Sequence, residues 1–190
     1  MRKFLLAVIF AFLGSSFLFA DTYNLDKAHT QIGFTVSHLV ISHVSGAFRD
    51  FNGTINYDPG DVTKSTVDVH IMAASVNTGD DKRDGHLKSP DFFDVQKFSE
   101  LTFKSTKIGK KGDGFVEYGP LTIHGVTKDV ELPFTIAGTI KDGMGKTHLV
   151  AQSSITINRK DYGLTWNRAV EGGVLVGEDV KIDLSVEAVK

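Results

Sequence analysis

Cysteine is absent from the 190-residue sequence, and tryptophan occurs once. A chain without cysteine has no disulfide framework and no catalytic thiol, so an apolar core alone must stabilise its fold. Basic residues are not in excess, because 21 Lys and Arg stand against 23 Asp and Glu, and no basic stripe is visible. The composition therefore gives no reason to expect binding to nucleic acid or to an anionic membrane surface.

Common enzyme motifs are missing as well. The sequence contains no HExxH zinc motif and no GxSxG nucleophile elbow, and its seven histidines show no familiar zinc spacing. The segment GMGKT at residues 143–147 resembles the end of a phosphate loop, but Ile140 occupies the position where that loop needs its first glycine. We expect no catalytic residue, no metal ion and no cofactor.

Long apolar runs are confined to the first twenty residues. Arg2 and Lys3 are basic, residues 4–13 are an unbroken apolar run, and polar sequence begins after Ala20. This order is typical of a secretory signal peptide, and a run of about ten residues is shorter than the roughly twenty that a membrane helix needs. We expect residues 1–20 to be a signal peptide and residues 21–190 to be one domain without a membrane segment. A secreted chain without cysteine fits a bacterial periplasm.

Apolar and polar residues alternate with period two along most of the remaining chain. This pattern predicts strands with one buried and one solvated face. Turn sequences such as Asp58-Pro59-Gly60 separate the strands, and His124-Gly125 predicts a tight hairpin with His124 in the left-handed region. The clearest alternating sets are Ile32-Phe34-Val36, Val67-Val69-Ile71-Ala73, Val130-Leu132-Phe134-Ile136, Ile155-Ile157 and Val180-Ile182-Leu184-Val186.

Two of the predicted strands are unusually long. Residues 126–141 and 147–158 continue for sixteen and twelve residues, whereas ordinary strands average five or six. Long antiparallel strands with one apolar face form a sandwich or a barrel, and an eight-stranded barrel can hold one slender ligand. Only Thr78 to Lys88 has helical character, with Thr78 as the expected N-cap and Ser89-Pro90 as the stop. One short helix in an all-β chain suggests a lid at an open end.

The chain resembles the YceI-like family of bacterial periplasmic polyisoprenoid-binding proteins. The resemblance implies an extended eight-stranded antiparallel lipocalin-like β-barrel with one short α-helix, and it implies a homodimer. It also implies that the lumen holds a long-chain amphiphile, such as an isoprenoid quinone or a polyprenyl phosphate. The segments that carry the resemblance are DKAHTQIGF (26–34), His38, VSGAFRDFNG (44–53), TGDDKRDGHLKSPDFFD (78–94), LTIHGV (121–126) and RKDYGLTW (159–166).

The segment RDGHLKSPDFFD, residues 83–94, is rich in charged and aromatic side chains, and it allows three interpretations. A metal site could use Asp84, His86, Asp91 and Asp94, and an acid–base site could use Asp84 and His86. Residues two apart on a helix point about 200° apart, so Asp84 and His86 cannot act together unless other strands bring partners. The favoured interpretation is a barrel end-cap, in which a polar side chain meets the ligand head while apolar side chains cover its tail. The end-cap residues are Arg83, His86, Leu87, Phe92 and Phe93.

The remaining candidate ligand contacts are the apolar residues that should face the lumen. The favoured function is a periplasmic carrier that is not an enzyme and removes a long amphipathic lipid from water. Two alternatives stay open: a periplasmic hydrolase or isomerase acting on such lipids, and a structural or partner-binding β-sandwich with a filled core. The candidates are Ile32, Phe34, Val36, Ile71, Phe103, Leu132, Phe134 and Ile136, with Leu164 and Trp166 near an opening.

Overall fold

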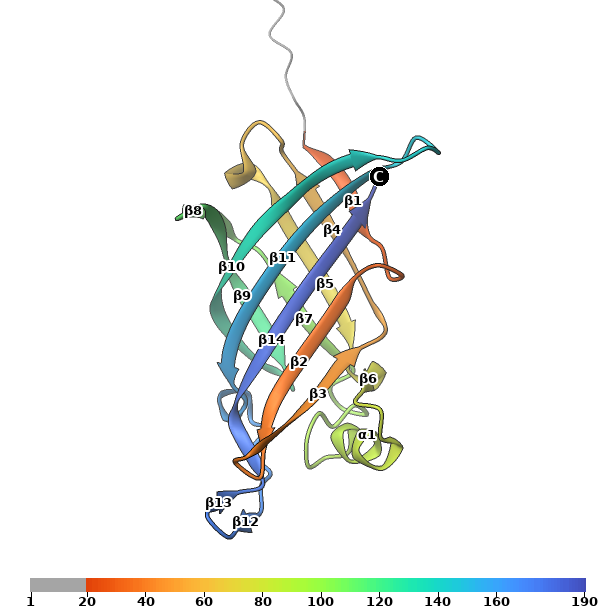
Figure 1. Cartoon of the computed structure of the whole chain (residues 1–190). Helices are drawn as coiled ribbons and strands as arrows, with labels where there is room; N and C mark the ends of the chain where they lie inside the picture. Colours follow the sequence, from red (N-terminus) through yellow and green to blue (C-terminus); the bar gives the residue numbers. More distant parts are fainter. Residues whose placement is uncertain (1–19) are drawn as a thin grey trace, which may run out of the picture.

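Strands dominate the computed structural model, which describes residues 20–190 (Figure 1). Almost the whole predicted signal peptide, residues 1–20, lies outside the described residues. Within residues 20–190, no helix has both the length and the apolar character needed to span a membrane. The elements are β1 (Asp21–Leu25), β2 (Gln31–His38), β3 (Ser42–Phe48), β4 (Phe51–Tyr57), η1 (Val62–Lys64), β5 (Thr66–Met72), η2 (Ala73–Ser75), β6 (Val76–Asn77), α1 (Asp81–Lys88), β7 (Glu100–Lys104), β8 (Lys107–Lys111), β9 (Gly114–Ile123), β10 (Val126–Lys141), β11 (Thr147–Asn158), η3 (Arg159–Tyr162), β12 (Ala169–Val170), β13 (Gly173–Val174) and β14 (Val176–Val189).

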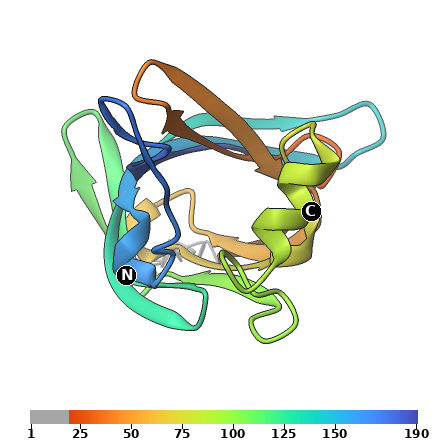
Figure 2. The ribbon, with the colours of Figure 1, turned by 90° about the horizontal axis from the view of Figure 1, so that it is seen from below.

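Eight antiparallel strands close into a barrel. Their order around the ring is β1, β4, β5, β7, β9, β10, β11 and β14. The last strand pairs back with the first, where Leu25 lies opposite Ala188 and Asn24 lies opposite Val189. The view along the barrel shows the strands arranged as a ring, with α1 beside one end (Figure 2). The predicted eight-stranded antiparallel barrel with one short helix is confirmed for the described part of the chain.

The barrel branches toward the end that carries α1. Strand β14 pairs with β1 near its C-terminal end, but its earlier residues pair with β2, from Val176 opposite His38 to Ser185 opposite Gln31. Strand β2 pairs with β3, and β3 pairs with β6, where Phe48 lies opposite Val76. Figure 1 shows α1 below β3 and β6. The helix therefore lies where the sheet has separated from the ring.

The two long strands have the predicted bounds, since β10 spans 16 residues and β11 spans 12. The register between them shifts between Ile136 and Gly138, and Gly138 has a φ of 143° that a residue with a side chain rarely adopts. His124 has a φ of 51° in the two-residue connection from β9 to β10. The predicted left-handed histidine in a tight hairpin is therefore confirmed.

The helix begins later than the sequence predicts. Asp80 is the N-cap of α1, and its carboxylate accepts hydrogen bonds from the backbone N–H groups of Lys82 and Arg83, both at 3.0 Å. Thr78 is not the cap, because its backbone N–H and its hydroxyl both donate to Asp84, at 2.9 and 2.6 Å. The predicted end is correct, with Ser89 as the C-cap. Both Thr78 and Asp80 are cap-forming residue types, and a tertiary contact decides between them.

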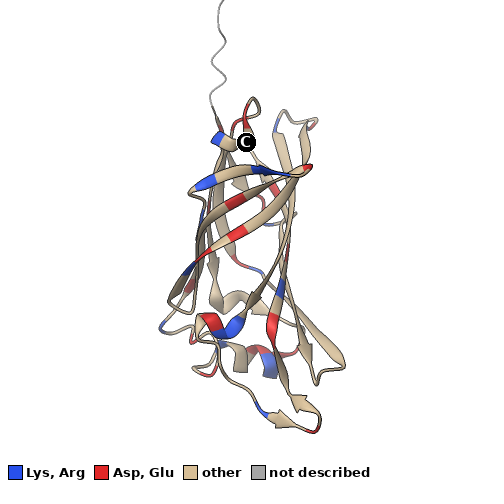
Figure 3. Cartoon of the chain, turned by 90° about the vertical axis from the view of Figure 1, so that its left-hand side faces the viewer, with Lys and Arg blue, Asp and Glu red and all other residues tan. Residues whose placement is uncertain are grey.

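Two apolar clusters occupy the barrel interior toward its two ends. The lower cluster lies at the α1 end, and the upper cluster lies at the end where β1 meets β14. Charged residues of both signs occur along the whole length of the ribbon (Figure 3). The buried members of the lower cluster are Ile32, Phe48, Phe51, Ala73, Val76, Leu101, Ile123, Tyr162 and Leu164, and those of the upper cluster are Tyr23, Ile55, Leu149 and Ala188.

Candidate functional site

The barrel interior contains a cavity of about 180 Å³ between and beside the two clusters. Its wall is almost wholly apolar, because the strands alternate and direct their apolar side chains inward. Among residues 20–190, no Lys, Arg or His lines this cavity. The polar side chains in the wall are Thr30, Tyr57, Ser65, Glu117, Gln152 and Ser153.

Most of the predicted inward residues line this cavity. Val36 is the exception, because it is half-buried on β2 between Val44 and Val180 on the neighbouring strands and lies outside the cavity wall. The alternation therefore identifies the inner face correctly, whereas contact of these side chains with a ligand stays a prediction. The predicted residues in the wall are Ile32, Phe34, Ile71, Phe103, Leu132, Phe134 and Ile136.

Arg83 is engaged with Thr78 at the start of α1. Its Nε donates to the Thr78 hydroxyl at 2.7 Å, and one Nη donates to the Thr78 carbonyl at 3.1 Å. Thr78 in turn donates twice to Asp84, a carboxylate that is 5% exposed. This network of three side chains ties the helix to the segment that follows β6. Arg83 does not lie in the cavity wall.

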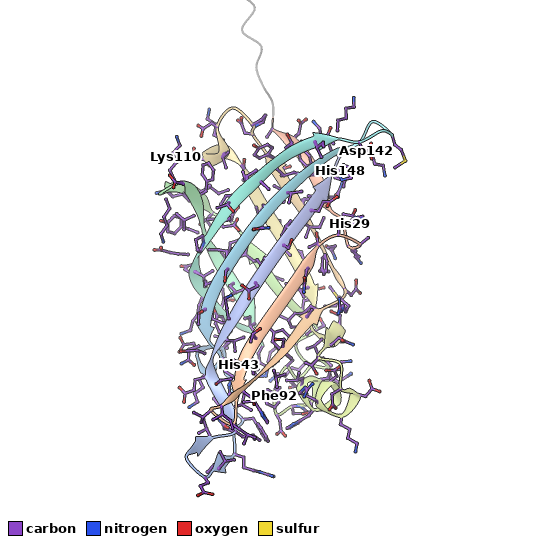
Figure 4. The ribbon with its side chains drawn as sticks, viewed as in Figure 1. His29, His43, Phe92, Lys110, Asp142 and His148 are labelled. Atoms are coloured by element: carbon purple, nitrogen blue, oxygen red, sulfur yellow. The ribbon has the colours of Figure 1, made fainter. Side chains whose placement is uncertain are left out.

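His86 belongs to a small aromatic group that joins α1 to the segment after η3, and Figure 4 shows Phe92 on the barrel side of α1. Its Nε2 lies 2.9 Å from Asp91 Oδ2, and its ring meets the rings of Phe92 and Trp166 edge-on at centroid distances of 5.0 and 4.7 Å. Phe92 also packs against Trp166 at 5.2 Å. None of these side chains lines the cavity among the described residues. These ring contacts hold α1 and the segment after it against the segment that follows η3.

The other predicted end-cap residues fill the lower cluster. Leu87 and Phe93 pack against it, and Phe93 meets Phe48 edge-on at 5.6 Å. Leu164 is a buried member, and its carbonyl accepts a hydrogen bond from the buried Arg159 guanidinium. None of the seven end-cap and opening residues of the sequence prediction lies in the cavity wall as the structure describes it. Their direct contact with a ligand stays a prediction.

Glu117 is a cavity residue that the sequence reasoning missed. It lies on β9 directly opposite Ile108 of β8 and Leu132 of β10, so it shares their inward face. The residue is 7% exposed, and within residues 20–190 its Oε2 has no hydrogen-bond partner. Burial raises the pKa of this carboxyl to about 7. The sequence contained a signal for this direction, because Glu117 lies an even number of residues before Leu121 and Ile123 and so shares their face of the strand. Gly119 and Pro120 interrupt the alternation and obscure it.

A second hollow lies on the barrel wall, where β2, β3, β8, β9, β10, β11 and β14 form an open groove of about 760 Å³. The groove is larger than the inner cavity, but ten of its lining residues are polar or charged, including Lys111 and Asp183. A lipid tail placed there would stay exposed to water on one side, so the smaller inner cavity is the better apolar site. Phe34 and Phe134 line both hollows.

Histidines and carboxylates gather at the end of the barrel away from α1, where Figure 4 shows His29, His148 and Asp142. His148 Nδ1 lies 2.7 Å from Glu187 Oε1, and its Nε2 lies 3.2 Å from Asp142 Oδ2. His29 Nδ1 lies 2.8 Å from Asp26 Oδ2. Asp26, His29 and Glu187 have ligand atoms within 4.8 Å of one another and are a group that could hold a metal ion. Hydrogen bonds already engage these atoms, and the prediction of no metal site stays a prediction.

Both ring nitrogens of His148 face carboxylate oxygens, and they can both donate only when the imidazole is charged. The hydrogen bonds to Asp142 and Glu187 raise the pKa of His148. The same contact with His148 lowers the pKa of Asp142. These contacts connect the β10–β11 loop, β11 and β14, so the group stabilises the rim of the barrel.

Comparison with known proteins agrees with this architecture. A UPF0312 protein of Serratia proteamaculans is 36% identical over 173 residues, which cover 90% of this chain and 88% of that protein. The crystal structure of a Campylobacter jejuni YceI protein is 36% identical with a TM-score of 0.71, covering 87% of this chain and 96% of that one. A polyisoprenoid-binding domain from Saccharophagus degradans shares the fold at 19% identity, with a TM-score of 0.65 and coverage of 87% and 97%. The YceI-like domain profile matches residues 23–188, and the chain therefore belongs to the YceI-like family.

Proposed function

We propose that this protein is a periplasmic carrier that holds a long-chain amphipathic lipid in the barrel lumen. The observation that carries the proposal is the apolar cavity enclosed by an eight-stranded barrel. The fold likeness to a domain described as polyisoprenoid-binding supports an isoprenoid chain as the ligand class. The periplasmic location rests on the predicted signal peptide, and the homodimer rests on the family resemblance.

The driving force is transfer of apolar surface from water into the lumen. Each buried methylene contributes about 0.8 kcal/mol, so ten methylenes contribute about 8 kcal/mol before the costs of ordering the chain. The cavity of about 180 Å³ is smaller than the roughly 300–1,000 Å³ of common small-molecule sites. A long chain therefore requires that lining side chains change rotamer. The phenylalanines of the wall, whose rotation would open space, are Phe34, Phe48, Phe103 and Phe134.

The geometry supports two other functions less well. A lipid hydrolase would need a nucleophile beside a base, but the Ser65 hydroxyl accepts from the backbone of Asp58, and the Ser153 hydroxyl donates to the carbonyl of Pro133. A sandwich with a filled core would leave no interior cavity. Binding without chemistry is therefore the function that the geometry supports best.

Native mass spectrometry of protein purified from bacterial cells tests the proposal. We expect a bound lipid mass that disappears after solvent extraction and returns when a C20 isoprenoid alcohol is added. Only the mass of the protein alone, before and after such addition, would contradict a carrier. A new product mass from the added lipid would instead favour the enzyme.

A further inference from the structure

Glu117 is the feature of the lumen that an apolar lipid tail does not explain. The side chain is more than nine-tenths buried, faces inward between Ile108 and Leu132, and leaves Oε2 without a partner among the described residues. A buried polar atom without a hydrogen bond destabilises a folded protein by about 1–3 kcal/mol. A ligand that supplies the missing hydrogen bond would remove this cost.

The charge of the cavity wall restricts which ligand can do so. Glu117 and Tyr57 are the titratable residues in the wall as the structure describes it, and no basic side chain accompanies them. A buried anion needs a cation or several donors beside it, because transfer of a charge from water into an apolar site is strongly unfavourable. An anionic phosphate or carboxylate head beside Glu117 would have neither.

We propose, building on the proposed lipid-binding function, that Glu117 holds the uncharged hydrogen-bonding head of the lipid inside the lumen. The matching chemistry is a hydroxyl, a primary amide or a carbonyl, because a carboxyl group can both donate to and accept from such groups when it is protonated. The same wall disfavours a phosphorylated or carboxylate head. Glu117 is thus a specificity-determining residue that selects neutral lipids.

The position of Glu117 along β9 gives the height of the bound head in the barrel. Glu117 is the fourth residue of the strand, about 10 Å from its start at the end away from α1. The next inward apolar residues on this strand are Leu121 and Ile123, toward the α1 end, and both line the cavity. On this strand, a head at Glu117 leaves apolar wall for the tail in the direction of the lower cluster.

A competition between three lipids with one tail tests this assignment. Delipidated full-length protein is mixed with geranylgeraniol, geranylgeranyl monophosphate and a C20 isoprenoid hydrocarbon, and native mass spectrometry from detergent micelles gives the relative affinities. We expect the wild-type protein to bind the alcohol at least tenfold more tightly than the phosphate. Glu117→Leu should lower the affinity for the alcohol about tenfold and leave the affinity for the hydrocarbon unchanged. Glu117→Gln should keep an affinity for the alcohol within about threefold of that of wild type.

A matched control is Glu131→Gln, because Glu131 lies one position before Leu132 but faces outward, where it pairs with Lys111. This variant should leave all three affinities unchanged. Equal binding of the alcohol by Glu117→Leu and wild type, or a wild-type preference for the phosphate, would overturn the role of Glu117 while the carrier function survives. If no variant binds any of the three lipids, the proposed function fails together with this inference.

Discussion

Glu117 also determines how the interior of the barrel responds to pH. The carboxyl is buried in an apolar wall, and burial raises its pKa from 4.5 to about 7. Between these two values the folded protein binds more protons than the unfolded chain, so the free energy of unfolding decreases as the pH rises. Below pH 4.5 the group is protonated in both states and contributes no pH dependence.

We therefore expect Glu117 to reduce the free energy of unfolding by about 3 kcal/mol as the pH rises from about 4.5 to above 7. Glu117→Gln keeps the shape of the side chain and removes its titration, so its stability should exceed that of wild type increasingly over this range. Urea denaturation of both proteins at several pH values measures the difference. A difference that is the same at pH 4.5 and pH 8 would show that the carboxyl is not buried in the folded state.

Prediction from sequence succeeds at residues that follow the alternation and fails where it is interrupted. Leu132, Phe134 and Ile136 lie on an uninterrupted alternating run, so their inward direction was predictable. Glu117 belongs to the same inner surface, but a glycine and a proline separate it from the next apolar residues. A charged residue is expected to face solvent, and only the pairing partners Ile108 and Leu132 reveal that it does not.

At the scale of elements, α1 is fixed by the contacts among Thr78, Arg83 and Asp84. Arg83→Leu removes two hydrogen bonds to Thr78, so we expect a loss of about 1–2 kcal/mol in the free energy of unfolding. Because Arg83 lies outside the cavity wall, the loss of affinity should be equal for geranylgeraniol and for the hydrocarbon without a head. Urea denaturation and the lipid competition measure the two effects.

Lys82→Leu is the control for this helix, because Lys82 is the preceding residue and is exposed. It should change the stability by less than about 0.5 kcal/mol and leave lipid binding intact. If Arg83→Leu lowered the affinity for geranylgeraniol but not for the hydrocarbon, Arg83 would contact the lipid head, as one interpretation of the sequence holds.

The histidines at the rim, His148 with Asp142 and Glu187 and His29 with Asp26, predict a second pH effect, which begins at about pH 6.5. The pKa of His148 is raised by Asp142 and Glu187, and that of His29 is raised by Asp26. A histidine with a raised pKa stabilises the folded state fully below about 6.5, and this contribution is lost as the pH rises through the folded-state pKa. The barrel should therefore lose stability when the pH rises above about 6.5.

His148→Gln, made in the Glu117→Gln background, isolates this contribution. The melting temperature of the double variant should fall less between pH 6.5 and pH 9 than that of Glu117→Gln alone. A smaller decrease with pH should remain, because His29 still loses its proton over this range. Parallel curves for the two proteins would show that the contacts of His148 contribute no stability through its charge.

The bounds of elements were predictable where local sequence decides them. Strands β10 and β11 end at turn residues, and their predicted bounds are those of the structure. The start of α1 was predicted two to three residues early, because Thr78 uses its hydroxyl for Asp84 instead of capping the helix. The branching of β14 between β1 and β2 was not predictable, since pairing of distant segments leaves no local pattern.

For the whole molecule, the alternation predicts inward apolar residues but does not distinguish a hollow barrel from a filled one. The barrel is partly filled and partly hollow, because close-packed clusters lie toward its ends and a cavity lies along the wall between them. Val76 belongs to the lower cluster, is 2% exposed and does not line the cavity, whereas Phe134 lines it. Added volume at Phe134 should therefore reduce lipid binding and change stability little, whereas added volume at Val76 should reduce stability and leave lipid binding unchanged.

Phe134→Trp adds volume to the lumen, where space is available, so we expect a loss below about 1 kcal/mol in the free energy of unfolding and a clear loss of lipid uptake. Val76→Leu forces volume into the close-packed cluster, where overpacking costs about 1–3 kcal/mol, and should leave uptake by the folded protein unchanged. Urea denaturation and native mass spectrometry with geranylgeraniol measure both quantities for each variant. A large loss of stability in Phe134→Trp, with no lipid uptake in wild type to compare, would instead indicate a filled interior, because the added ring would then have no space to enter.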